Sequence, residues 1–207
     1  GNQGQCAFSV TVRDTTPPQL TCPAGLVAEA RSAQGAAVDF SVGALDAVTD
    51  AGLALTYSQA PGSVFAPGTT RVTASAQDAA GNTGTCAFDV TVRDTTPPVV
   101  LCPVGPVLEA TGARGAAAFF VLGASDAVTE APEVTSSAAS GSTFPVGTTQ
   151  VTVSARDAAG NTGTCAFAVT VRDTTPPQLT CPADQTLVAT QPEGAPAFFS
   201  ASASDAV

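Results

Sequence analysis

One string of residues returns along the chain at a nearly constant interval. RDTTPPQLTCP begins at Arg13, RDTTPPVVLCP begins at Arg93, and RDTTPPQLTCP begins again at Arg172. The strings therefore recur with a period of about 80 residues, which is too long for a solenoid turn or a propeller blade. Such a period suits a string of small domains that each have their own core.

The repeat divides the chain into two complete units and two partial ones. We expect complete domains over 15–94 and 95–173. Residues 1–14 match the last strand of a preceding repeat, and residues 174–207 match the first part of a following one. The sequence thus predicts a segment of a longer array.

Charge and composition exclude several classes of function. The chain has a net charge of −10, all seven of its basic residues are arginine, and it has no histidine. Nucleic acids and anionic membranes both attract basic surfaces, so we expect no nucleic-acid partner and no membrane insertion. The missing histidine removes Ser-His-Asp triads and Cys/His zinc sites, and we predict that the chain is not an enzyme.

The six cysteines are regularly spaced. They stand at positions 6, 22, 86, 102, 165 and 181, so short intervals alternate with long ones. Paired cysteines in small repeated units, without a C-x-x-C motif, are typical of disulfides formed in an oxidising compartment. We therefore expect a secreted or cell-surface protein.

The hydrophobic pattern has the period of a β-strand. In CAFDVTV, Cys86, Phe88, Val90 and Val92 fall on one face, and turn sequences such as DAAGNTG separate this segment from its neighbours. Short alternating segments between turns indicate an antiparallel sandwich. The predicted strands lie near 19–30 (broken), 36–42, 53–59, 69–77 and 84–93, with a short extra strand near Val64.

These motifs resemble those of the HYR, or hyalin repeat, domain. The resemblance rests on DTTPP…CP, on the run GSTFPVGTTQVTVSARDAAGNTGTCAFAVTV from Gly141 to Val171, and on the period. It implies tandem immunoglobulin-like antiparallel β-sandwiches, related to fibronectin type III modules, in secreted and surface proteins associated with adhesion. Many members carry further cysteines in the middle strands, where this chain has Thr56, Ala74 or Val153.

A sandwich of this kind implies which cysteines pair. Its first and last strands both start at the N-terminal pole, which places Cys22 beside Cys86 and Cys102 beside Cys165. A Cys6–Cys22 bond is disfavoured, because roughly 26 Å of extended chain and a double proline follow Cys6. Cys6 and Cys181 are then expected to pair with residues outside the chain.

Each linker between domains is short and contains a double proline. Two prolines remove two backbone donors and fix two φ angles, so we expect a stiff joint. A stiff joint at every repeat predicts a rod. The linker prolines are Pro17, Pro18, Pro97, Pro98, Pro176 and Pro177.

Oxygen ligands gather in the loops predicted at the N-terminal pole of each domain. Asp14, Asp46, Asp50, Asp78 and Asn82 are expected to converge at one joint, and Asp94, Asp126, Glu130, Asp157 and Asn161 at the next. Oxygen-only ligands from three loops suit Ca²⁺. The alternative is that these side chains only bond to their own turns.

One predicted surface is unusually apolar. Phe119 and Val121 fall on the face opposite the core series of the second unit, and Phe198 repeats the placement, whereas the first unit has Asp39 there. Such side chains either pack under a crossing loop or offer a contact for lateral packing of rods.

The leading hypothesis is a nonenzymatic extracellular structural protein, a rigid stalk or fibre of tandem repeats with an adhesive role. Its partners would be copies of itself in filaments, or surface adhesion partners. One alternative is a module that binds a glycan or protein, although the repeated DAAGNTG loops and the absence of tryptophan oppose it. The other is a spacer array of a larger secreted enzyme.

Overall fold

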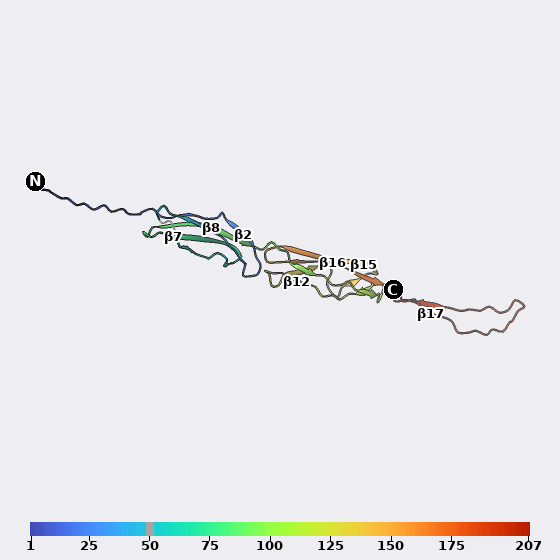
Figure 1. The fold of residues 1–207 in the computed structure, drawn as a ribbon. Helices are drawn as coiled ribbons and strands as arrows, with labels where there is room; N and C mark the ends of the chain where they lie inside the picture. Colours follow the sequence, from blue (N-terminus) through green and yellow to red (C-terminus); the bar gives the residue numbers. More distant parts are fainter. Residues whose placement is uncertain (49–51) are drawn as a thin grey trace. The chain divides into compact units, whose positions relative to one another are not determined.

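The computed structural model describes residues 1–48 and 52–207, and within them the chain is entirely β, with no helix (Figure 1). No segment of that described chain forms a helix long and apolar enough to cross a membrane. The chain divides into unit 1, residues 1–96 with 126–130, and unit 2, residues 97–125 with 131–207.

Unit 1 consists of one four-stranded sheet and two two-stranded ladders. The sheet has the strand order β2-β8-β7-β5, and the ladders are β1–β4 and β3–β6. The strands are β1 (Gln19–Thr21), β2 (Leu26–Glu29), β3 (Ala36–Ala37), β4 (Gly43–Leu45), β5 (Leu55–Tyr57), β6 (Val64–Phe65), β7 (Gly68–Gln77) and β8 (Thr83–Arg93).

Unit 2 repeats this arrangement. Its four-stranded sheet has the order β10-β16-β15-β13, and its ladders are β9–β12, β11–β14 and, in the partial third repeat, β17–β18. The strands are β9 (Val99–Leu101), β10 (Val107–Glu109), β11 (Ala116–Ala117), β12 (Gly123–Ser125), β13 (Glu133–Ser136), β14 (Thr143–Phe144), β15 (Gly147–Arg156), β16 (Thr162–Arg172), β17 (Gln178–Thr180) and β18 (Ser202–Ser204).

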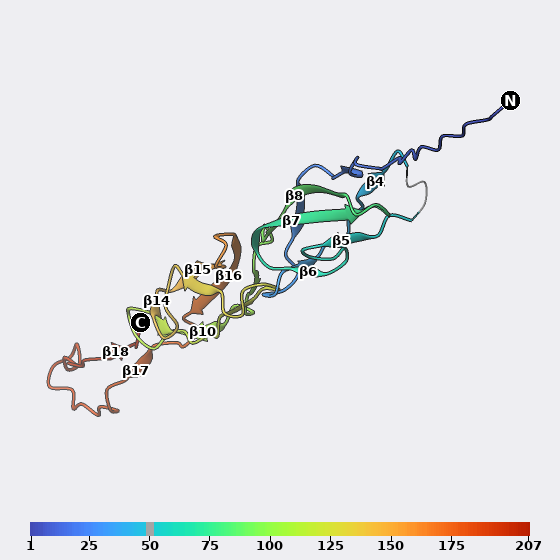
Figure 2. The same ribbon diagram turned by 90° about the vertical axis from the view of Figure 1, so that its left-hand side faces the viewer.

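A long hairpin forms the centre of each unit. β7 pairs antiparallel with β8 from Gly68 opposite Val92 to Gln77 opposite Thr83, and the two strands lie side by side in Figure 2. Val72 and Val90 point inward and are fully buried, while the residues between the inward positions are mostly exposed. The alternation predicted from the sequence is therefore confirmed for this hairpin.

The core of unit 1 is built around Phe40. Its ring makes edge-to-face contacts with Tyr57, Phe65 and Phe88 at centroid distances of 5.7, 6.3 and 4.9 Å. Such pairs add about 0.5–1.5 kcal/mol each beyond the burial of their area. In unit 2, Phe120 contacts Phe167 in the same way at 4.9 Å.

The sandwich is antiparallel as predicted except for one parallel pair of strands in each unit, which the sequence analysis did not predict. β2 pairs parallel with β8, with Leu26 opposite Val90, and β10 pairs parallel with β16. The cause is the break in the first strand, which the sequence does predict. After β1 has paired with β4, the CPAG sequence at 22–25 interrupts the strand, and β2 continues in the other sheet.

The strand predicted over 36–42 is shorter than expected. Only β3 and β4 carry ladder pairs here, although Val38 and Val42 between them are buried. The backbone between them bonds to a loop instead, since the Val38 N–H donates to the Ser63 carbonyl at 3.2 Å. Inward and outward side chains therefore still alternate between β3 and β4, although these residues form no regular ladder of backbone hydrogen bonds.

Both expected disulfides are present. Cys22 is bonded to Cys86 and Cys102 to Cys165, with Cα–Cα distances of 5.9 and 6.1 Å. Cys6 and Cys181 are free and exposed, and their pairing with residues outside the chain stays a prediction.

Removing the Cys22–Cys86 bond should destabilise unit 1 selectively. Closing a loop of 64 residues is worth about 4 kcal/mol in the chain-entropy model, so Cys22→Ser with Cys86→Ser should lower its unfolding free energy by about 2–4 kcal/mol. Tyr57 is the chain's one tyrosine and there is no tryptophan, so intrinsic fluorescence during urea unfolding reports on unit 1.

The matched control is Cys102→Ser with Cys165→Ser, which removes the equivalent bond from unit 2. It should leave the urea midpoint of the Tyr57 transition unchanged. Far-ultraviolet circular dichroism should show part of the strand signal lost at a lower urea concentration. A Tyr57 transition that responds equally to both variants would contradict the independence of the two cores.

Candidate functional site

The turn of the β7–β8 hairpin buries an aspartate. The Asp78 side chain is 7% exposed, and its Oδ1 accepts the Asn82 backbone N–H at 2.8 Å. The Asn82 side-chain amide donates to Asp78 Oδ2, also at 2.8 Å. Gly81 closes the turn at a φ of 94°, a conformation that favours glycine.

These hydrogen bonds keep Asp78 ionised. Burial acts to raise its pKa, but the Asn82 side chain and the backbone N–H groups of residues 80–82 together outweigh it, and the pKa of Asp78 lies below its usual 3.8. In the turn of β15–β16, Asp157 and Asn161 make the same bonds at 2.8 and 2.8 Å, and the pKa of Asp157 is lowered for the same reasons.

Two further aspartates of unit 1 lie beside that turn. Asp14, which precedes the linker, accepts the Thr16 N–H at 3.0 Å through Oδ1. Asp46, just after β4, accepts the Val48 N–H at 3.0 Å. The Asn82 amide also donates to the Asp14 backbone oxygen at 3.3 Å, so Asn82 serves as a donor that joins Asp14 to the turn.

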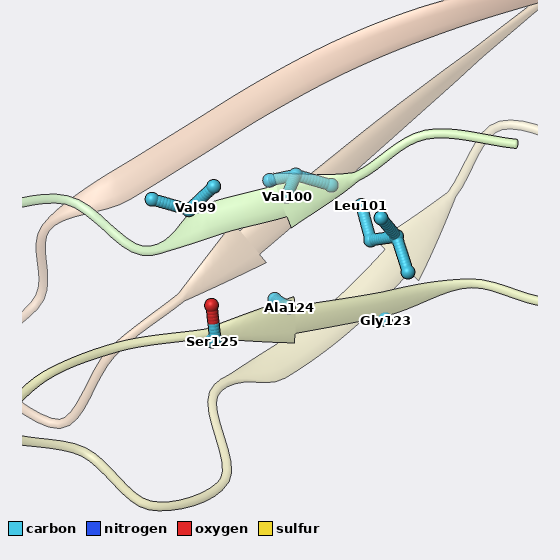
Figure 3. Close-up of a pocket in the computed structure, with 6 residues that line it drawn as sticks. All are labelled: Val99, Val100, Leu101, Gly123, Ala124 and Ser125. Atoms are coloured by element: carbon cyan, nitrogen blue, oxygen red, sulfur yellow. The ribbon is translucent and has the colours of Figure 1, made fainter.

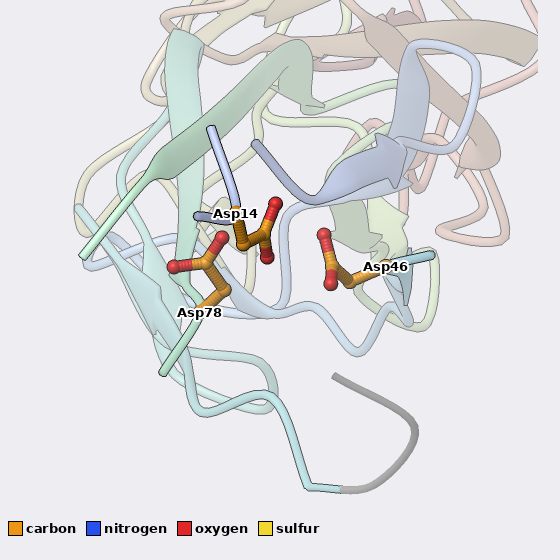
Figure 4. Close-up of side chains that lie close together, drawn as sticks. All are labelled: Asp14, Asp46 and Asp78. Carbon is orange, nitrogen blue, oxygen red and sulfur yellow. The ribbon is translucent and has the colours of Figure 1, made fainter. Parts of the chain in front are cut away.

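The carboxylates of Asp14, Asp46 and Asp78 converge. One oxygen of each lies within 4.8 Å of the others, and Figure 4 shows the three groups turned toward one another. Three carboxylates so close repel one another unless a cation lies between them. Hard oxygen ligands from three separate segments are what Ca²⁺ binds. We call these three residues the aspartate cluster.

The other predicted ligands are placed as follows. Asp94 accepts the Thr96 N–H at 3.2 Å, and Asp126 accepts those of Val128 and Thr129 at 2.8 and 2.7 Å. Glu130 is exposed. Asp50 lies outside the described residues.

A second carboxylate feature, which the sequence analysis missed, holds the linker. Glu29 ends β2, and its carboxylate accepts the Thr95 N–H and the Thr95 hydroxyl, both at 2.7 Å. The Thr96 hydroxyl donates to the same carboxylate at 2.9 Å. Hydrogen bonds to a carboxylate are about twice as strong as neutral ones. Glu29 thus fixes the Thr-Thr segment against its own unit, and we call this contact the glutamate clamp.

The glutamate clamp occurs again in unit 2. Glu109 accepts the Thr174 N–H at 2.7 Å, the Thr174 hydroxyl at 2.9 Å, and the N–H and hydroxyl of Thr175 at 3.1 and 3.0 Å. The parallel pairing explains both cases. Because β2 runs alongside β8, Glu29 lies beside the chain as it leaves β8. The available sequence signal was the recurrence of Glu29 at Glu109, one repeat later.

The clamp lowers the pKa of both glutamates. For Glu29 the largest cause is the Thr95 backbone N–H, followed by the Thr95 hydroxyl; burial opposes them, and Thr96 adds further lowering. The pKa of Glu109 is lowered in the same way by Thr174 first and Thr175 last. Both lie below the usual 4.5, so the acceptors are charged at neutral pH.

The second proline of the first two linkers packs against the unit that follows it. Pro18 is buried, and a Cβ added at Gly84 of β8 would collide with the Pro18 carbonyl oxygen. Pro98 is buried too, and Gly163 of β16 stands in the same relation to its carbonyl. Glycine is required at these positions because backbone approaches backbone.

The fold and these contacts define a tandem-repeat protein built of disulfide-closed immunoglobulin-like β-sandwiches. The family model described as the HYR domain matches residues 13–92 and 93–171, and the chain belongs to that family. These matches start two residues before our boundaries at 15 and 95.

Among curated relatives, the chain is similar to hyalins of two species. It is 38% identical over 193 residues to hyalin of Lytechinus variegatus, covering 88% of this chain and 36% of that protein. It is 38% identical over 189 residues to hyalin of Strongylocentrotus purpuratus, covering 86% of this chain and 16% of that protein. The chain thus spans only a minor part of either relative.

Similarity to solved structures is more distant. The titin domains z1z2 in complex with telethonin give a TM-score of 0.44 at 13% identity, covering 78% of this chain and all of that one. Extracellular cadherin domains 1–4 of protocadherin gamma B7 give a TM-score of 0.35 at 16% identity. The match covers 84% of this chain and 55% of that one. At these TM-scores the fold assignment depends on the strand pairing described above.

The glutamate clamp should make unit 1 sensitive to acid. A carboxyl whose pKa is lowered on folding stabilises the fold above its unfolded pKa, and that contribution is lost as pH falls through the folded pKa. The Tyr57 urea midpoint should therefore fall between about pH 5 and pH 3. Glu29→Gln should flatten this dependence, because its amide does not titrate.

The matched control is Glu133→Gln, at an exposed glutamate of β13. It should leave the pH dependence of the Tyr57 transition unchanged. If Glu29→Gln and the wild-type chain give parallel curves, the clamp contributes nothing to stability.

Proposed function

We propose that this chain forms part of a secreted, nonenzymatic structural protein in which tandem HYR sandwiches make a stiff extracellular stalk or fibre with an adhesive role. The disulfides suit an oxidising extracellular compartment. The family resemblance supports the association with adhesion. The main support for stiffness is that the linker between the two complete repeats is held on both sides.

The linker between the two complete repeats has very little free length. On one side, Thr95 and Thr96 bond to Glu29 of unit 1. On the other, Pro98 packs against Gly163 of unit 2. Only Pro97 lies between these held points, and its ring fixes its own φ. A linker with so few free torsions restricts the orientation of one domain relative to the next. A glycine- or serine-rich linker of the same length would not.

Breaking the clamp should loosen the joint without unfolding either unit. In weakly aligned ¹⁵N-labelled chain, residual dipolar couplings of the two units should give alignment tensors of equal amplitude. Glu29→Ala frees Thr95 and Thr96, and the two amplitudes should then diverge, because one unit reorients relative to the other.

Glu109→Ala provides the control, since it breaks the equivalent clamp on Thr174 and Thr175 of the following linker and leaves the Glu29 contacts in place. It should leave the amplitudes equal. Unequal amplitudes in the wild-type chain would refute the proposed stiffness, and equal amplitudes in Glu29→Ala would remove the clamp as its cause.

We also propose that the aspartate cluster binds Ca²⁺ and thereby fastens the linker to the domain that follows it. The proposal is supported by the mutual approach of Asp14, Asp46 and Asp78 within 4.8 Å. Asp14 lies on the incoming chain, while the other two belong to the sandwich. A shared cation would therefore tie these segments together. The same three aspartates recur in the sequence as Asp94, Asp126 and Asp157.

Calcium should raise the melting temperature of unit 1. Extracellular calcium modules have dissociation constants of about 10⁻⁴–10⁻³ M, so about 5 mM Ca²⁺ should shift the Tyr57-detected melting upward relative to chelator. Asp46→Asn should weaken binding about tenfold or more, while its amide oxygen still accepts the Val48 N–H.

Asp39→Asn is the matched control. Asp39 is exposed and accepts the Phe40 N–H at 3.0 Å, a local bond that asparagine retains, and it lies outside the aspartate cluster. It should leave the calcium shift intact. The absence of any calcium shift in the wild-type chain would eliminate the proposal.

A further inference from the structure

One sheet face of unit 2 is apolar and exposed. Val99 and Leu101 of β9 are 71% and 69% exposed, and Phe119 and Val121, just before β12, are 78% and 84% exposed. We call these four residues the apolar face.

The four side chains lie on one side of one layer. β9 pairs with β12, with Leu101 opposite Gly123 and Val99 opposite Ser125. Phe119 and Val121 have the same parity along the chain as Gly123, and the residues of opposite parity, Phe120 and Leu122, pack against the core. Because strand side chains alternate, the apolar face points away from that core.

The face also contains a hollow. Gly123 has no side chain, and a cavity of about 260 Å³ is lined by Val99–Leu101 and Gly123–Ser125. Figure 3 shows Val99 and Leu101 above Gly123 and Ser125. An apolar cavity of about 150 Å³ admits benzene, so this hollow has room for a phenyl ring. Phe119 offers such a ring on the same face.

The equivalent positions of unit 1 are polar. Gln19, Thr21, Asp39 and Ser41 stand where unit 2 has Val99, Leu101, Phe119 and Val121. The fold therefore tolerates polar side chains at these positions and does not require apolar ones. Something other than the stability of the sandwich accounts for the apolar set in unit 2.

We propose that the apolar face of unit 2 is a contact between two copies of this chain. A ring on the face and a hollow beside it make the surface self-complementary, as a two-fold contact requires, with Phe119 of each copy entering the hollow of the other. Charge opposes a contact between copies least at this face. The chain carries −10 overall and copies repel elsewhere, while none of the six residues at 99, 101, 119, 121, 123 and 125 is charged.

The size of the face makes the contact weak. Four side chains at these exposures present on the order of 400 Å², against about 800 Å² per partner in a stable complex. We expect a dissociation constant on the order of 10⁻⁴ M for one pair of faces. In a longer array with several such faces, weak contacts would add by avidity.

The test exchanges the two sets of residues within the full chain. One variant carries Val99→Gln, Leu101→Thr, Phe119→Asp and Val121→Ser, which are the residues that unit 1 has at these positions. The reverse variant carries Gln19→Val, Thr21→Leu, Asp39→Phe and Ser41→Val. Sedimentation equilibrium measures association, and circular dichroism checks that each variant is folded.

The first variant should raise the dissociation constant at least tenfold, and the reverse variant should lower it. A wild-type chain that stays monomeric at millimolar concentration overturns the proposal, as does association that the first variant leaves unchanged. Should the first variant fail to fold, the reverse variant decides alone: unchanged association overturns the contact. This inference extends the proposed fibre, but its failure would leave the dipolar-coupling test of the joint unaffected.

Discussion

The long hairpin in each unit is the constraint on which the other features depend. In unit 1, its inward valines and alanines are almost completely buried, so the register between β7 and β8 cannot slip without exposing the core. That register fixes the turn containing Asp78 and Asn82 at one end and the exit of the chain at the other. It also places Cys86 and Gly84 where the first strand and the linker meet them. The hairpin thereby supplies one partner to the disulfide, to the linker contact and to the aspartate cluster of unit 1.

Much of this hairpin could be predicted from the sequence, because its information is local. Alternation in CAFDVTV and the turn sequence DAAGN identify two strands and their connection without knowledge of the rest of the fold. The parallel pairing of β2 with β8 could not be predicted in this way. It depends on a strand changing sheets after a break at CPAG, and the sequence shows the break but not the partner that β2 finds beyond it. The sequence analysis predicted a broken strand near 19–30 but not the parallel partner of its second half.

The glutamate clamp was missed for the same reason. An exposed glutamate at the end of a short strand is ordinary, and nothing in its neighbourhood along the chain points to Thr95, which is 66 residues away. Only the parallel pairing brings them together. Asp14, Asp46 and Asp78 were predicted because strand parity alone assigns their loops to one pole. The sequence analysis therefore predicted the three aspartates, whose positions follow from the alternation of strand direction. It missed Glu29, whose position depends on the parallel pairing.

The two carboxylate features act on neighbouring residues of the repeated Asp-Thr-Thr sequence: the clamp holds the threonines, and the aspartate cluster includes the aspartate before them. Glu29 holds the threonines that leave a unit, and the aspartate cluster lies where the preceding linker enters it. The two features differ in what each needs in order to form. The clamp is satisfied by hydrogen-bond donors of the chain itself, so it forms whenever the unit is folded and the glutamate is charged. The aspartate cluster brings three negative groups together and gains from a cation that the surroundings must supply. Under the calcium proposal, the clamp would thus be fixed by folding, and the strength of the aspartate cluster would follow the calcium concentration around the chain. The stiffness of such an array would then respond to calcium through the aspartate cluster and not through the clamp.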